Sequence, residues 1–130
     1  MIDVRALIVD DSSVMRKIVE RSLRQAGLES LAVFEAGSGV EGLELLRSQK
    51  VDIILSDINM PLMDGLEFVR QLKLQKVADG TPIVMITTES SEEHVKQAIL
   101  SGAQGYIRKP FTAEQVKERV LPLLAAVQGG

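Results

Sequence analysis

Five short apolar segments alternate along the chain with longer segments whose apolar residues recur at helical spacing. The short segments are residues 5–9, 30–34, 51–55, 82–86 and 105–108. Short apolar runs rich in β-branched residues are typical of buried strands, and strands that alternate with helices form parallel sheets through right-handed crossovers. This alternation therefore predicts an α/β fold, a doubly wound five-stranded parallel sheet with five flanking helices.

Capping residues mark where the predicted helices begin. Each helical segment follows a residue type that accepts backbone hydrogen bonds at a helix N-terminus. The candidates are a serine after Asp11, Ser38, Asp64, Ser90 paired with Glu93, and Thr112 paired with Gln115. In the second helix, Val40, Leu43 and Leu46 are expected to face the core.

Four of the predicted strands end in residues that could take part in chemistry. These residues are Asp10 and Asp11, then Asp57, Thr87 and Lys109. The carboxyl ends of parallel strands lie along one edge of the sheet, where open α/β sheets bind ligands. Three neighbouring carboxylates cannot all ionise without a cation, and an oxygen-only ligand set suits a hard ion, Mg²⁺ with Mn²⁺ as a substitute. A lysine and a hydroxyl would complete a site for a phosphoryl group, with one carboxylate as a covalent nucleophile.

Charge and composition exclude several classes of function. The net charge is -3 and there is no basic tract, which argues against nucleic-acid binding through phosphate neutralisation. The chain has no cysteine, no apolar stretch that approaches a membrane span, and no apolar leader at its start. We therefore expect a cytoplasmic protein that binds no membrane, folded as a single domain over residues 1–130.

Several motifs together resemble the response-regulator receiver domain of two-component signalling. They are Val9-Asp10-Asp11-Ser12, Asp57-Ile58-Asn59-Met60-Pro61, Met63-Asp64-Gly65, Thr87 and Lys109-Pro110-Phe111. The resemblance covers essentially the whole chain and points to the stand-alone chemotaxis type. It implies a flavodoxin-like sheet with strand order 2-1-3-4-5, and a single receiver domain without an output domain.

The resemblance also implies how the acidic residues act. Asp57 would be the phosphoacceptor. Asp11, Asp57 and the backbone carbonyl of Asn59 would hold Mg²⁺, and Asp10 would assist through water. Asn59, Thr88 and Glu89 would tune the lifetime of the phosphoryl group, because they flank the path of the attacking water. Thr88 stands where the family usually has alanine or glycine, so its β-branched side chain could slow phosphotransfer.

Lys109, Thr87 and Tyr106 would read the phosphoryl group. Lys109 would bind one of its oxygens, and the peptide bond from Lys109 to Pro110 is expected to be cis. Thr87 would move to donate a hydrogen bond to the phosphoryl group, and Tyr106 would then turn inward into the vacated space. This switch would alter a face made of the fourth helix, fifth strand and fifth helix.

The implied partners are proteins, and the implied role is signalling. A sensor histidine kinase of the CheA type, or a small phosphodonor, would supply the phosphoryl group, and the flagellar switch would be the target. The chain would catalyse its own phosphorylation and dephosphorylation as a monomer, but would not be an enzyme acting on other molecules.

Other functions stay open at this point. One is a phosphorelay intermediate or a kinase-regulating receiver outside chemotaxis. A small phosphatase of the haloacid-dehalogenase type is more distant, because it expects an acid where Asn59 stands. A flavodoxin-like FMN carrier would need a Ser/Thr-rich phosphate loop after the first strand, where two aspartates stand instead.

Overall fold

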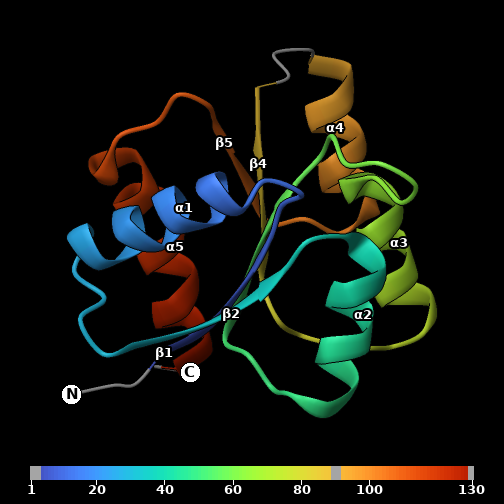
Figure 1. Cartoon of the computed structure of the whole chain (residues 1–130), viewed down its shortest axis with the longest axis horizontal. Coiled ribbons are helices and arrows are strands. Elements are labelled where there is room, and N and C mark those ends of the chain that lie inside the picture. The colour runs from blue at the N-terminus through green and yellow to red at the C-terminus, as the bar shows by residue number, and fades with distance from the viewer. Residues whose placement is uncertain (1–3, 89–91, 129–130) are drawn as a thin grey trace.

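The structure, a computed structural model, describes residues 4–88 and 92–128 and forms a five-stranded parallel sheet between two layers of helices (Figure 1). In chain order the elements are β1 (Val4–Val9), α1 (Ser13–Gln25), β2 (Leu31–Ala36), α2 (Gly39–Ser48), β3 (Ile53–Asp57), α3 (Gly65–Leu74), β4 (Ile83–Thr87), α4 (Glu92–Ser101), β5 (Gly105–Arg108) and α5 (Ala113–Gln128). The strand order is β2-β1-β3-β4-β5, and every neighbouring pair is parallel. The expected fold class and strand order are therefore confirmed.

Two aliphatic cores cover the two faces of the sheet. Helices α1 and α5 lie on one face, and α2, α3 and α4 lie on the other (Figure 1). Successive strand residues point to opposite faces, so Leu7 packs under α2 and α3 while Ala6 and Ile8 pack under α1 and α5. A central strand that is apolar on both faces is what the continuous runs predicted.

The expected capping residues hold the helix N-termini. Ser12, Ser38 and Asp64 accept hydrogen bonds from backbone N–H groups in the first turns of α1, α2 and α3. At α5, Thr112 and Gln115 form a reciprocal pair, with bonds of 2.9 and 3.2 Å. The capping pair expected before α4 begins at Ser90, which lies outside the described residues.

Several local expectations were wrong. Strand β3 begins at Ile53 and not at Val51. Strand β2 does not end at Phe34 but runs to Ala36, because its pairing with β1 continues through Glu35 and Ala36. Val40 does not face the core and is 56% exposed. The inward position is taken by Gly42, whose bare backbone packs against the Phe68 ring. Within the described part of the chain, none of the helices combines the length and the apolar composition that a membrane crossing requires.

Candidate functional site

Three carboxylates converge at the carboxyl edge of the sheet. Asp10 follows β1, Asp11 begins the loop to α1, and Asp57 is the last residue of β3. One oxygen atom from each lies within 4.8 Å of the others. Asp10 and Asp57 are buried, whereas Asp11 is exposed. The parallel ladder places them together, because Val9 is in register with Ser56 and brings both strand ends to one level.

Lys109 supplies a cation to this cluster. Its Nζ lies 3.2 Å from Asp10 Oδ2 and 3.6 Å from Asp57 Oδ2. The backbone N–H of Lys109 donates to the carbonyl of Thr87 at 2.8 Å, which ties the loop after β5 to the end of β4. The peptide bond from Lys109 to Pro110 is cis, as expected. One ammonium thus faces two buried carboxylates.

The loop between β3 and α3 is held close to the cluster. The Asn59 N–H donates to Asp57 Oδ1 at 3.3 Å. The Gly65 N–H donates to the carbonyl of Ile58 at 2.7 Å, so the loop turns tightly back onto the end of β3. An atom added at the Cβ position of Gly65 would collide with the backbone oxygen of Asp57. Only glycine therefore fits where α3 begins.

The surroundings of the Asp57 carboxyl raise its pKa above the ordinary value. Burial raises its pKa, the Lys109 ammonium lowers it, the Asp10 carboxylate raises it again, and backbone N–H groups of Asn59 and Ile58 lower it, with a net upward shift. One lysine thus leaves the negative charge undercompensated. Three carboxylate oxygens without nitrogen or sulfur partners fit a hard divalent cation such as Mg²⁺, which would offset the remaining negative charge.

The raised pKa predicts a pH-dependent stability. In Mg²⁺-free buffer, Asp57→Asn should raise the free energy of unfolding, and the gain should grow as the pH rises above about 4, the ordinary pKa of an aspartate. A carboxyl whose pKa is higher in the folded state destabilises that state as it ionises, and the penalty vanishes where both states are protonated. Urea unfolding at a series of pH values measures the difference between the two proteins.

Asp79→Asn controls for the loss of one negative charge, because Asp79 is exposed and lies in the turn before β4, at the other end of the sheet. A gain for Asp57→Asn that stays constant with pH, or shrinks as the pH rises, would contradict the raised pKa.

Two successive threonines, the last residue of β4 and the residue after it, differ in exposure. Thr87 is fully buried, whereas Thr88 is exposed. Tyr106 is half-buried on the neighbouring strand β5, in register with Met85, and the Arg119 guanidinium lies over its ring, 5.8 Å from the centroid. Glu89, expected to flank the site, lies outside the described residues. The structure therefore places the candidate switch residues Thr87 and Tyr106 on adjacent strands, and their movement stays a prediction.

One residue beside the cluster was not predicted from the sequence. Arg16 of α1 donates through Nη1 to the backbone carbonyl of Asp10 at 2.6 Å. Its Nε donates to Glu35 at 2.9 Å. The only sequence signal was an arginine one turn after the helix cap, and its partner comes from a strand nineteen residues away. That pairing depends on the register of β2.

Comparisons with known proteins agree on one family. The model of the family described as "Response regulator receiver domain" matches residues 6–121. A protein from Campylobacter jejuni named chemotaxis protein CheY homolog is 39% identical over 127 residues, which cover 97% of this chain and 96% of the relative. The chemotaxis protein CheY of Pseudomonas aeruginosa is 35% identical over 126 residues, covering 97% of this chain and all of the relative. A solved structure of Vibrio cholerae chemotaxis protein CheY4 has a TM-score of 0.83 at 36% identity, covering 94% of this chain and 99% of that one.

Proposed function

The chain belongs to the response regulator receiver domain family, and we propose that it is a chemotaxis-type receiver that is switched by phosphorylation of Asp57. With the family established, the phosphatase and flavin-carrier alternatives no longer apply. The observation that carries the proposal is the cluster itself: Asp10, Asp11 and Asp57 lie within 4.8 Å of one another beside the Lys109 ammonium.

The proposed reaction is transfer of a phosphoryl group to a carboxylate. An Asp57 oxygen attacks phosphorus, the new P–O bond forms, and the bond from phosphorus to the donor's histidine nitrogen breaks. Attack of water on the same phosphorus later releases inorganic phosphate and restores the Asp57 carboxylate. The same chain catalyses both steps in this proposal, while acting as a signalling domain rather than as an enzyme on other substrates.

The charged residues divide the work of this reaction. Mg²⁺, which receiver domains bind at this acidic site, would be held by Asp11, Asp57 and the backbone carbonyl of Asn59, with help from Asp10. When bound, it would supply positive charge next to the phosphoryl group. Mn²⁺ would serve as a substitute. Lys109 would exchange its contacts with the carboxylates for a phosphoryl oxygen.

The proposed switch couples the new dianion to one face of the molecule. The Thr87 hydroxyl would donate a hydrogen bond to the phosphoryl group, and Tyr106 would turn into the space that Thr87 leaves. Thr87 is the last residue of β4, and Tyr106 lies on β5. The face formed by α4, β5 and α5 would therefore differ between the two states. Asn59, Thr88 and Glu89 would set how long the phosphorylated state lasts.

Receivers of this family act between a histidine kinase and a downstream target. For this chain we place a CheA-like kinase upstream and the flagellar switch downstream, because curated relatives that are 35% and 39% identical over nearly the whole chain are named chemotaxis proteins. The proposal includes a cytoplasmic monomer in which residues 1–130 form one receiver domain.

Beryllofluoride, a phosphoryl mimic, tests the assignment of the site. With Mg²⁺ present, it should shift the NMR signals of the Asp57, Thr87, Lys109 and Tyr106 backbones. The same addition without Mg²⁺, or to Asp57→Asn, should leave them unchanged. Shifts that do not need Mg²⁺, or that persist in the variant, would contradict the proposed site.

Thr88→Ala should accelerate phosphotransfer from acetyl phosphate. Thr88 is exposed immediately after the buried Thr87, so its branched side chain can narrow the approach to Asp57. We expect a gain of about two- to fivefold, which corresponds to less than about 1 kcal/mol of barrier. Initial rates at saturating Mg²⁺ measure it.

Thr81→Ala is the matched control, because it removes the same atoms just before β4, at the amino end of the strand and away from the acidic cluster. Equal rates for wild type and Thr88→Ala would remove the idea that Thr88 restricts access.

A further inference from the structure

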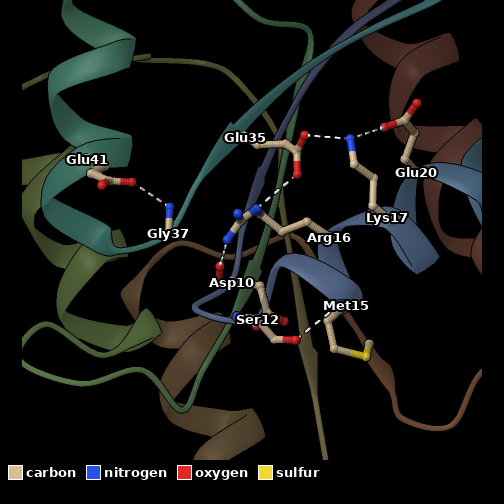
Figure 2. Close-up of polar contacts among 9 residues, drawn as sticks. All are labelled: Asp10, Ser12, Met15, Arg16, Lys17, Glu20, Glu35, Gly37 and Glu41. Atoms are coloured by element: carbon tan, nitrogen blue, oxygen red, sulfur yellow. Dashed lines mark hydrogen bonds and ion pairs between the residues drawn. The ribbon is translucent and has the colours of Figure 1, made fainter.

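A chain of charged contacts runs from α1 to β2 beside the acidic cluster (Figure 2). Arg16 is at its centre and is only 18% exposed. Its Nε donates to one oxygen of Glu35 at 2.9 Å, and its Nη1 donates to the Asp10 carbonyl at 2.6 Å. The second oxygen of Glu35 accepts from Lys17 at 2.9 Å. The guanidinium thus bridges a carboxylate on β2 and the backbone that leads into the acidic loop.

The contact with Asp10 matters because it fixes a peptide group. The Asp10 N–H donates to the Ala36 carbonyl at 3.1 Å, and the Asp10 carbonyl accepts from Arg16, so both ends of this residue are held. The same carbonyl belongs to the peptide plane that sets the direction of Asp11. Among the described residues, no hydrogen bond or ion pair holds the Asp11 carboxylate itself. Its position therefore depends on its backbone.

We propose that Arg16, anchored by Glu35, is a positioning residue that aims the Asp10-Asp11 backbone toward the divalent cation. This inference rests on the proposed function and extends it to a residue that touches neither the cation nor the phosphoryl group. Groups outside the ligand shell that orient ligands typically change metal affinity when they are removed.

The anchor is built to keep Arg16 in place. Glu35 lies on β2, whose carboxyl end is fixed because the Gly37 N–H donates to Glu41 at 2.6 Å (Figure 2). Hydrogen bonds from Lys17 and Arg16 hold the pKa of Glu35 below its usual value, so the anchor is ionised at neutral pH. Lysine could not replace Arg16, because one ammonium lacks the planar fork that reaches two separated acceptors.

Helix α1 also carries a matched control. Arg24 makes the same two kinds of contact as Arg16, with a carboxylate, Glu20, at 3.2 Å and with a backbone carbonyl of β2, Leu31, at 3.1 Å. Leu31 is the first residue of β2, so these contacts lie at the amino end of the strand, away from the acidic cluster at the carboxyl ends. Arg24→Gln therefore removes an equivalent bridge without touching the loop of Asp10.

The test compares Mg²⁺ binding by wild type, Arg16→Gln and Arg24→Gln, using calorimetry on folded protein. Arg16→Gln should weaken Mg²⁺ binding about tenfold, whereas Arg24→Gln should stay within about twofold. Glu35→Gln should weaken it about two- to threefold, and the double variant should be no weaker than Arg16→Gln alone. Phosphorylation of Arg16→Gln by acetyl phosphate should need more Mg²⁺ but recover near saturation.

A merely structural role for Arg16 would lower the unfolding midpoint but leave the Mg²⁺ affinity of the folded fraction unchanged. Equal affinities for Arg16→Gln and Arg24→Gln would overturn the inference, as would full additivity of Arg16→Gln and Glu35→Gln. The proposed function is tested separately, on the wild type alone. A wild type that binds Mg²⁺ but is not phosphorylated would overturn that function, while the result on Arg16 and Mg²⁺ affinity would still hold.

Discussion

Asp57→Asn should reduce the consumption of acetyl phosphate by at least about 100-fold, because removing a covalent nucleophile removes the reaction it starts. Asp57 is the carboxylate at the end of β3, with the Lys109 ammonium 3.6 Å away and the Asn59 N–H on its other oxygen. The amide of asparagine fits this space but is a far weaker nucleophile. Release of inorganic phosphate in the presence of Mg²⁺, corrected for protein-free hydrolysis, measures the effect.

Ser56→Ala is the control for this result. Ser56 is the neighbouring buried residue, and its hydroxyl donates to the Asp57 backbone carbonyl at 3.0 Å. Removing that hydroxyl should leave phosphate release within about threefold of wild type, since it lies outside the carboxylate cluster. Undiminished release by Asp57→Asn, or loss of release by Ser56→Ala, would place the chemistry elsewhere.

Gly65→Ala should destabilise the protein by about 2–3 kcal/mol, the upper part of the range of about 1–3 kcal/mol that is typical when a buried site is overpacked. A Cβ at this position would meet the Asp57 backbone oxygen, and it would lie 2.6 Å from Met85 Cε and 2.7 Å from Ile58 Cα. Two of these three atoms are backbone, so the end of β3 must shift to make room. The unfolding midpoint should fall by about 10 °C, measured by circular dichroism.

The same shift should also weaken the site. Asp57 and the Asn59 carbonyl lie in the displaced segment, so Mg²⁺ affinity of folded Gly65→Ala should fall at least about tenfold. Gly105→Ala is the matched control, because nothing lies within 4 Å of a Cβ added there. It should change stability by less than about 1 kcal/mol. Similar losses for the two variants would show that contact with Asp57 is not the cause.

The layers of the fold followed from the apolar pattern, but the order of the strands in the sheet did not. Alternating strands and helices predicted a parallel sheet covered on both faces, and the run 105–108 matches β5 residue for residue. The order 2-1-3-4-5 came only from family resemblance, because apolar runs carry no information on which strands are neighbours. Neighbours are decided by packing between residues far apart in the chain.

Helix faces were harder to predict where glycine takes part in the core. Spacing assigned Val40, Leu43 and Leu46 to the buried face of α2, yet Val40 is 56% exposed. Gly42 packs against Phe68 instead and turns the buried stripe away from Val40. A hydrophobicity pattern cannot find this position, because glycine has no side chain to count.

The charged residues of the candidate site could be predicted from the sequence, whereas the residues that hold them in position could not. Asp10 and Lys109 directly follow strands and Asp57 ends one, so topology alone brings the three residues to the carboxyl ends of the strands. Arg16 reaches that edge through a hydrogen bond to a backbone carbonyl and an ion pair with Glu35. Both contacts depend on the register between β1 and β2, which residue types do not encode locally.

The most direct test is the intact mass of wild-type protein after incubation with acetyl phosphate, with Mg²⁺ or with a chelator. We expect one added phosphoryl group with Mg²⁺ and none with the chelator. The adduct should be removed by hydroxylamine, which cleaves an acyl phosphate but not a phosphate ester. No adduct under any condition, an adduct that forms without Mg²⁺, or one that resists hydroxylamine would contradict phosphorylation of Asp57 at a metal-bound acidic site.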